Sequence, residues 1–212
     1  MEQPENFKDL SQITGYFLNK EESLTGAEDL ALMKQVHGST VLVIDKAPDP
    51  ENPPMADGFI TQTPGLKLAV KTADCIPLLI ADPLQKTVGA FHVGWKPGLL
   101  GIVESAILTF QKLGSQPQHL VAALGPALGK PSFPVSKEMM QLYPEPERIF
   151  FEQKEEGIFF DNTAYIIYRL KRAGIQNIWA SSTNTYRDLT YHSFRRENGA
   201  KGRQYSIIFL NT

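Results

Sequence analysis

A run of short, strand-like segments near the middle of the chain most constrains how it can fold. Four segments are rich in β-branched and aromatic residues; they span residues 58–61, 67–71, 76–81 and 87–93. Turn signals such as Thr63-Pro-Gly65 and Ala81-Asp-Pro83 separate them. Residues 76–80 are apolar throughout, which is typical of a strand covered on both faces. The run therefore predicts neighbouring strands of a sheet with a buried centre.

Helical periodicity occurs after this run. From Leu99 onward, apolar residues recur every three or four positions, and Gly114 provides a stop. Asp161 is placed to cap a second helix, which Gly174 ends, and Ser136 to begin a shorter one. The chain thus carries three predicted helices, all on the C-terminal side of the strand run.

Two further strands are predicted at residues 177–180 and 205–210. Strands come in runs and helices lie between the groups, a pattern that favours α+β over a regular βαβ series. We therefore expect an α+β fold, with mixed β-sheets and peripheral helices. A length of 212 residues suits a single domain spanning residues 1–212, with residues 1–12 as a loose N-terminal segment.

Charge and composition restrict the partners and the compartment. The net charge of −2 offers no general attraction to nucleic acid or to an anionic membrane. No stretch reaches the roughly 18 to 20 apolar residues that span a bilayer, and the acidic, polar N-terminus does not resemble a signal peptide. A single cysteine cannot form an internal disulfide. We therefore expect a cytoplasmic protein that binds neither nucleic acid nor membrane.

The only cysteine, Cys75, lies between two histidines in equally distinctive contexts. His37 stands in Gln35-Val-His-Gly38, and His92 stands near the end of a predicted strand, before Gly94 and Trp95. If the strands at 76–81 and 87–93 pair as a hairpin, Cys75 and His92 come to the same sheet edge. One thiol and two imidazoles could form a three-ligand zinc site with an open position. They could equally form a metal-free Cys–His hydrolase. A third interpretation is that Cys75 is a small buried core residue.

Several motifs together resemble the laccase-domain, or multicopper polyphenol oxidase, family. The most specific are Thr72-Ala-Asp-Cys-Ile-Pro77 and His92-Val-Gly-Trp95. The others are Gln35-Val-His-Gly38, Ala56-Asp-Gly-Phe-Ile60, Pro64-Gly-Leu66, Asp82-Pro83, Leu124-Gly-Pro126 and Ser193-Phe-Arg-Arg196. The match runs in order from about residue 13 to the C-terminus. It implies a laccase-domain fold, which is similar to that of cysteine-dependent hydrolases.

The resemblance also implies an activity, because the family's members are regarded as zinc-dependent purine nucleoside phosphorylases with adenosine deaminase side activity. The metal ligands then fall on His37, Cys75 and His92, with the fourth position left for water or substrate. These three residues would carry the catalysis. Asp74, beside the thiolate, could join them by orienting a ligand or by acting as an acid or base; equally, it could only cap a turn. The substrates would be inorganic phosphate with adenosine, inosine or methylthioadenosine, and adenosine would be deaminated through water on the metal. A bound Zn²⁺ lowers the pKa of such water toward about 7.

A phosphate substrate needs a cationic cradle, and the C-terminal region is rich in arginine. We expect Arg195, Arg196, Arg203 and Lys96 to bind phosphate or substrate, since the planar guanidinium suits bidentate phosphate contacts. Lys96 stands where the family's His-Ala-Gly-Trp-Arg-Gly motif has arginine. Trp95 and Phe194 offer faces on which a purine could stack. Asp57 could orient a ligand or cap a turn.

The sequence is also compatible with other functions. One is a metal-free hydrolase or deamidase with Cys75 as nucleophile and His92 as base. Another is a nucleoside-binding protein that has lost activity, because the family's arginine-rich N-terminal stretch is replaced here by Gly15-Tyr-Phe-Leu-Asn-Lys-Glu-Glu22. Copper-dependent phenol oxidation is disfavoured, because four histidines are too few for a multicopper cluster.

Overall fold

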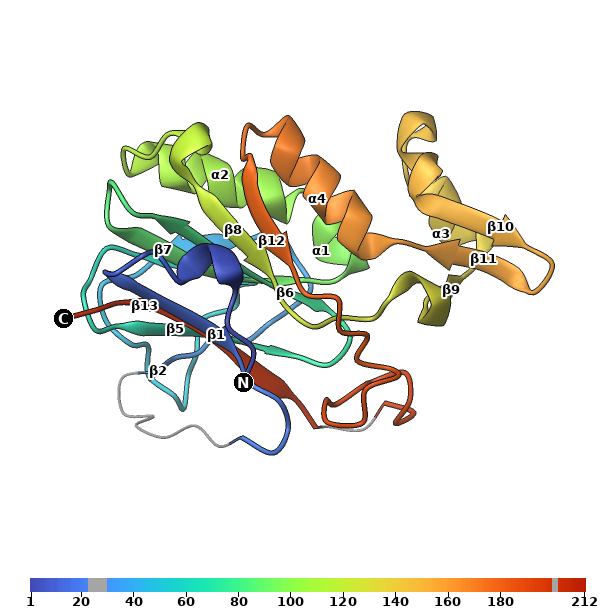
Figure 1. Ribbon diagram of the computed structural model, residues 1–212, viewed down its shortest axis with the longest axis horizontal. Helices are drawn as coiled ribbons and strands as arrows, with labels where there is room; N and C mark the ends of the chain where they lie inside the picture. The colour runs from blue at the N-terminus through green and yellow to red at the C-terminus, as the bar shows by residue number, and fades with distance from the viewer. Residues whose placement is uncertain (23–29, 200–201) are drawn as a thin grey trace.

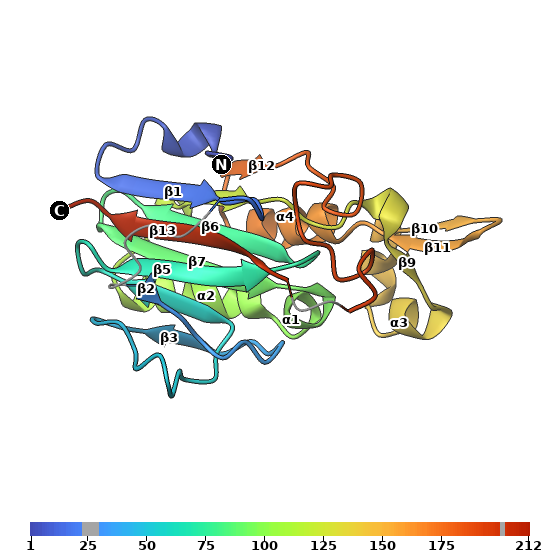
Figure 2. The ribbon, with the colours of Figure 1, turned by 90° about the horizontal axis from the view of Figure 1, so that it is seen from below.

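A six-stranded sheet forms the middle layer of the fold in the computed structural model, which describes residues 1–22, 30–199 and 202–212. Figure 1 shows helices on one face of this sheet, and Figure 2 shows a second sheet on the other face. The strand order is β12 (Asn177–Ala180), β8 (Val121–Leu124), β6 (Ile76–Asp82), β7 (Thr87–Val93), β4 (Gly58–Thr61) and β3 (Val41–Val43). The strands predicted at 58–61, 76–81, 87–93 and 177–180 all lie in this sheet.

The hairpin of β6 and β7 forms the centre of the sheet. Every residue of both strands is buried, as the apolar run at 76–80 predicts. The two strands pair antiparallel with Ile76 opposite Val93. This register places the start of β6 beside the end of β7, so the predicted meeting of Cys75 and His92 at one edge is confirmed.

A four-stranded sheet covers one face of this central layer. Its order is β1 (Ile13–Phe17), β13 (Gln204–Leu210), β5 (Lys67–Thr72) and β2 (Leu30–Ala31). Apolar side chains from the two sheets interdigitate; Leu79 and Val88 of the central sheet meet Leu68 and Ile208 of the outer one. The predicted strands at 67–71 and 205–210 are confirmed as β5 and β13.

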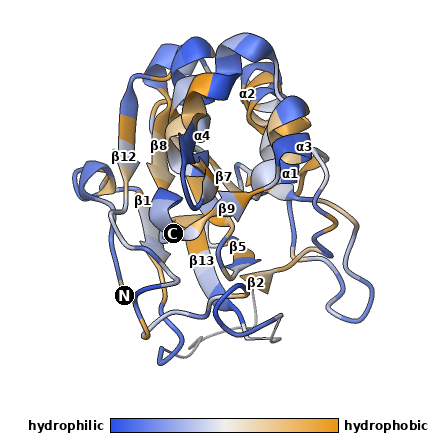
Figure 3. Ribbon diagram, turned by 90° about the vertical axis from the view of Figure 1, so that its right-hand side faces the viewer, coloured by the Kyte–Doolittle hydropathy of each residue, from blue (hydrophilic) through white to orange (hydrophobic). Residues whose placement is uncertain are grey.

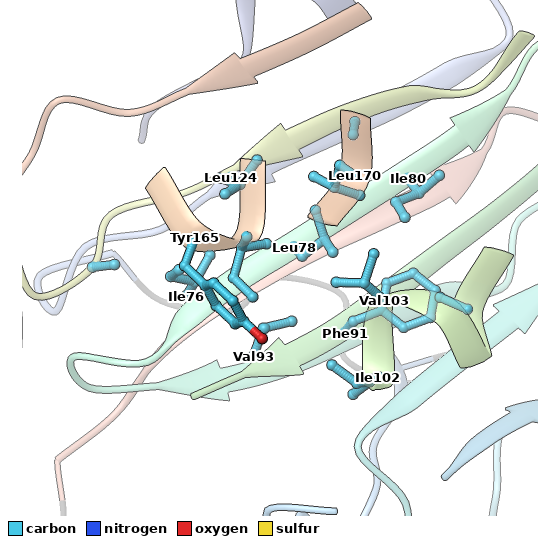
Figure 4. Packing of buried hydrophobic residues seen from close by; sticks show 14 of the residues in the cluster. Ile76, Leu78, Ile80, Phe91, Val93, Ile102, Val103, Leu124, Tyr165 and Leu170 are labelled. Carbon is cyan, nitrogen blue, oxygen red and sulfur yellow. The ribbon is translucent and has the colours of Figure 1, made fainter. Parts of the chain in front are cut away.

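Helices cover the opposite face. They are α1 (Trp95–Leu99), α2 (Ile102–Lys112) and α4 (Asn162–Arg172). Figure 4 shows Val103 and Leu170 from the helices packed on Leu78 and Phe91 of the sheet. In Figure 3 the strands and inner helix sides are mostly hydrophobic and the outer helix surfaces mostly hydrophilic. Burial of this kind contributes about 25 cal/mol per Å² of apolar area, so the two-sided core is the main source of stability.

One helix prediction is only partly right. A continuous helix was expected from Leu99 to Gly114, but Gly101 interrupts it with a left-handed backbone (φ 87°) and separates α1 from α2. A left-handed residue cannot continue a right-handed helix. The second prediction is confirmed, because the Asp161 carboxylate accepts a hydrogen bond from the Ala164 N–H at the start of α4.

A small three-stranded sheet projects beside the helical layer, at the right of Figure 1. It consists of β10 (Phe151–Lys154), β11 (Gly157–Phe160) and β9 (Pro134–Val135), with α3 (Lys137–Gln141) packed nearby. Ser136 caps α3 by accepting from the Met139 N–H, as predicted. Short 3-10 turns complete the described chain: η1 (Glu5–Phe7), η3 (Pro117–His119), η4 (Lys130–Ser132) and η5 (Glu145–Phe150).

The first twelve residues differ from expectation. They were expected to be loose, but Phe7 is only 1% exposed and packs between the layers with Ile13. The Asn6 side chain donates to the Ala122 carbonyl at 2.9 Å. Burial of the aromatic ring holds this segment down. The whole arrangement is the single-domain α+β fold that was predicted, and among the described residues no helix is long and apolar enough to cross a membrane.

Candidate metal centre

His37, Cys75 and His92 converge from three separate elements. His37 lies in the loop after β2, Cys75 in the turn before β6, and His92 near the end of β7. Their potential ligand atoms all lie within 4.8 Å of one another. The two imidazole rings meet edge to face with centroids 4.7 Å apart. The structure therefore brings together the three residues that the sequence singled out, and we call them the triad.

Asp57 holds two members of the triad in place. Its Oδ1 lies 2.8 Å from His92 Nδ1, and the same carboxylate accepts the backbone N–H groups of Val36, His37 and Gly38 at 2.6 to 3.2 Å. Asp57 is fully buried. The hydrogen bond to Nδ1 leaves His92 Nε2 as the ligand atom, which is the usual role of a carboxylate behind a metal-binding histidine. Asp57 thus has both of its expected roles: it orients His92 and it caps the turn that carries His37.

The electrostatics of the triad favour a thiolate. Burial raises the pKa of the Cys75 thiol, but the charge of His92 and the hydrogen bond from His37 outweigh it and lower the pKa to about 6. Burial lowers the pKa of His92, but Cys75 and Asp57 outweigh it and raise that pKa to about 9. Both shifts run against the effect of burial, and they favour the thiolate of Cys75 beside the imidazolium of His92. The thiolate is the form that binds a metal or attacks a substrate.

Glycine at position 94 makes room for the sulfur. A Cβ added to Gly94 would lie 2.8 Å from Cys75 Sγ and 3.8 Å from His37 Cδ2. A real side chain at this position would push into the space between the ligands. The chain therefore keeps the His-x-Gly-Trp pattern for a steric reason.

The triad fits a zinc ion by its donor set and spacing. Zinc binds thiolate sulfur at about 2.3 Å and imidazole nitrogen at about 2.0–2.1 Å, so ligand atoms on one tetrahedral ion lie about 3.5 Å apart. The ligand atoms of the triad lie within 4.8 Å of one another, so the side chains need to move together only slightly to reach this spacing. Three ligands leave a fourth position open, as in catalytic zinc sites.

A cleft of about 880 Å³ opens over the triad. Residues in or beside β5, β13, α1 and β9 line it, and Figure 2 shows the end of β5 and the beginning of β13 on the same side of the molecule as α1 and β9. Among the described residues, four cationic side chains line it, against one carboxylate. The cations are Lys34, Lys71, Arg195 and Arg203. This excess of positive charge suits an anionic ligand.

Two of the four residues predicted to bind phosphate or substrate line the cleft. Arg195 and Arg203 line the cleft, and each guanidinium lies 5.6 Å from the centroid of an aromatic ring, that of Phe133 and that of Phe194 respectively. Trp95 and Phe194 also line the cleft, and stacking of a base on them stays a prediction. The sequence interpretation missed Lys34 and Lys71. Both lie outside the arginine-rich segment, and only the packing of β2 and β5 beside the triad brings them in.

Arg196 and Lys96 do not line the cleft, contrary to expectation. The Arg196 guanidinium donates to the carbonyls of Thr185, Tyr186 and Tyr191, and it pairs with Glu197. Its donors hold a loop together and are not available to phosphate. Lys96 is exposed on the outer side of α1, because the helix turns the residue after Trp95 away from the cleft.

Two hydrogen bonds hold the Asp74 carboxylate in place. It lines the cleft, but its Oδ1 accepts from the Thr185 hydroxyl at 2.7 Å and its Oδ2 from the Arg195 N–H at 2.8 Å. These contacts join the Cys75 turn to the loop that carries Arg195. Asp74 also adopts a left-handed backbone (φ 83°), which turns the chain into Cys75. These contacts give Asp74 a positioning role, and its catalytic role stays a prediction.

Comparison with known proteins gives a consistent family. Residues 17–211 match the family model described as multi-copper polyphenol oxidoreductase laccase. A purine nucleoside phosphorylase of Streptomyces coelicolor is 35% identical over 182 residues, covering 84% of this chain and 74% of the relative. One of Rickettsia conorii is 34% identical over 176 residues, covering 80% and 72%.

Solved structures agree with the sequence matches. The hypothetical protein YfiH of Bacillus licheniformis superimposes with a TM-score of 0.88 at 26% identity, covering 96% of this chain and 95% of that one. YlmD of Geobacillus stearothermophilus gives a TM-score of 0.80 at 25% identity, covering 87% and 74%. The resemblance noted in the sequence is therefore confirmed: the chain belongs to the multi-copper polyphenol oxidoreductase laccase family.

Proposed function

We propose that this protein is a zinc-dependent purine nucleoside phosphorylase. The observation that carries the proposal is the position of the triad at the base of a cleft that four cationic side chains line. The names of the relatives from Streptomyces coelicolor and Rickettsia conorii support the same activity. Zinc is preferred to copper because the described residues offer one thiolate and two imidazoles in a single three-ligand group.

In this reaction an oxygen of inorganic phosphate bonds to C1′ of the ribose as the C1′–N9 bond breaks. The bonding electrons leave with the purine, which takes up a proton, and the other product is ribose 1-phosphate. Lys71 and Arg203 would neutralise the phosphate and hold it against the sugar, because both line the cleft beside the triad. Trp95 and Phe194 would hold the flat base by stacking.

His37, Cys75 and His92 would hold the metal, with Asp57 fixing the orientation of His92. When bound, the zinc would act as a Lewis acid toward substrate oxygen and as a source of activated water. The second role accounts for the proposed side reaction, in which water replaces the 6-amino group of adenosine to give inosine and ammonia. Adenosine, inosine and methylthioadenosine are the proposed nucleosides.

The test combines metal analysis with product analysis. Protein purified without chelator should contain about one zinc per chain, and it should release free base and ribose 1-phosphate from inosine only when phosphate is present. The Cys75→Ala variant should lose both the zinc and the activity. The matched control is His119→Ala, which removes a histidine from the distant turn η3 and should change neither.

Two other outcomes would favour a different function. Activity that survives chelation but is abolished by alkylation of Cys75 would indicate the metal-free Cys–His hydrolase. Tight nucleoside binding without turnover, in protein with its full zinc content, would indicate a binding protein. A metal-free protein that neither binds nor converts nucleosides would refute the assignment.

A further inference from the structure

The walls of the cleft differ in chemistry because they come from different layers of the fold. One wall belongs to the four-stranded sheet and the segments beside it, and it carries Lys34, Lys71, Arg203 and Tyr205. The other belongs to the helical layer and the loop before β9, and it carries Trp95, Leu128, Phe133 and Asn162. The two layers lie on opposite faces of the central sheet, at whose edge the triad sits. The first wall carries three of the four cations and suits a phosphate, whereas the second is mostly apolar, with only Arg195 over the ring of Phe133, and suits a base.

Asn162 is the polar exception in the second wall. It is the first residue of α4 and lines the cleft, yet it is only 3% exposed. No described residue hydrogen-bonds to its Oδ1, which is fully buried. Asp161 already caps the helix, so Asn162 is not needed there. A buried polar atom without a partner costs roughly 1–3 kcal/mol, so such a group calls for a partner that the protein itself does not supply.

A side-chain amide offers one donor and one acceptor side by side. The 6-position edges of natural purine nucleosides offer the complement. Adenosine presents the N6–H donor beside the N1 and N7 acceptors, and inosine presents the N1–H donor beside O6. Oδ1 has almost no accessible surface as the side chain stands, so rotation of the amide about χ2 is needed to bring it to the cleft. That rotation exchanges the two ends of the amide, so one asparagine can match both bases, as asparagine matches adenine in nucleic-acid recognition.

We propose that Asn162 reads the 6-position edge of the purine base through its side-chain amide. The proposal rests on the proposed function in one respect, namely that the cleft takes a purine nucleoside. Phe133 and Leu128 provide the apolar surroundings in which such a hydrogen bond discriminates, because an analogue without the donor leaves the buried amide unpaired.

The experiment measures binding without phosphate, so that it does not depend on phosphorolysis. Adenosine, inosine and purine riboside are titrated calorimetrically into the zinc-loaded protein, and chromatography of the adenosine mixture checks for deamination; where inosine has formed, the inosine titration carries the comparison with purine riboside. Purine riboside has the same ring and sugar but no donor at position 6 or at N1. The wild-type protein should bind adenosine and inosine at least about tenfold more tightly than purine riboside.

The Asn162→Leu variant has a side chain of similar size without the amide, and it should bind the three ligands within about twofold of one another. Asn162→Ala is the second variant, because it removes the amide without adding bulk, and it should show the same loss of discrimination. The matched control is Gln176→Leu, at an exposed position beyond the C-terminus of α4, which should keep the wild-type ratio.

Equal binding of adenosine and purine riboside by the wild-type protein overturns the proposal. So does a preference that survives unchanged in both Asn162 variants. If the wild-type protein discriminates as expected but releases no base in the presence of phosphate, the proposed phosphorylase function fails while the role of Asn162 stands.

Discussion

At the scale of single residues, one buried carboxylate decides the geometry of the centre. Asp57 touches His92 through its side chain and fixes the loop of His37 through three backbone N–H groups. We expect Asp57→Asn to lower zinc affinity by about 10- to 100-fold, because the neutral amide supports neither the ring orientation nor the basicity of His92 as well. Competition with a chelating dye measures the affinity. Asp45→Asn, at an exposed position, is the control, and an unaltered affinity in the Asp57 variant would contradict the assignment.

A second prediction at this scale concerns Gly94. In Gly94→Ala the new methyl group would meet Cys75 Sγ at 2.8 Å, well inside van der Waals contact. We expect zinc content to fall by more than about tenfold while the protein stays folded, because displacement of the thiolate spoils a ligand set with defined bond lengths. Gly38→Ala is a matched control, since its Cβ would meet its neighbours at an ordinary 3.5 Å. Normal zinc content in the Gly94 variant would show that the ligands tolerate the crowding.

At the scale of elements, the break between α1 and α2 positions the wall that carries Trp95. Gly101 makes this break with a φ of 87°, where a residue with a Cβ is strained. We expect Gly101→Ala to lower the free energy of unfolding by about 1 kcal/mol, the strain being partly offset by reduced freedom of the unfolded chain. Urea denaturation measures this free energy of unfolding. Gln111→Ala, on the exposed side of α2, should stay within about 0.5 kcal/mol of wild type. An equally stable Gly101 variant would mean that the backbone can relax at the break.

At the scale of the whole molecule, the triad links the two sheets. His37 follows a strand of the four-stranded sheet, whereas Cys75 directly precedes a strand of the central sheet and His92 lies in another. A metal that binds only the folded protein at 100 times its Kd adds about 2.7 kcal/mol of stability. We therefore expect chelation to lower the Tm by about 5–10 °C. In Cys75→Ala the Tm should not respond to chelator, and a wild-type Tm that is equally insensitive would argue against a metal bridge between the sheets.

The features that the sequence by itself determined are those set by local or short-range physics. Neighbours within a few residues determine the strand that contains His92, the hairpin through the Asp-Pro turn, and the caps at Ser136 and Asp161. The resemblance to the family's motifs added the prediction that the three residues of the triad are metal ligands. Hydrophobic periodicity also revealed the helices, although it did not reveal the break at Gly101, because one glycine is compatible with either a continuous or an interrupted helix.

Only the tertiary structure decided which groups surround the triad. Arg196 and Arg203 look alike in the sequence, yet one satisfies loop carbonyls and the other lines the cleft. Lys71 and Asn162 carry no local signal of function, because one lies in an ordinary strand and the other begins an ordinary helix. The physical reason is that a cleft forms where separate layers meet. Its lining therefore depends on strand order and register across the whole chain, which residue spacing does not encode.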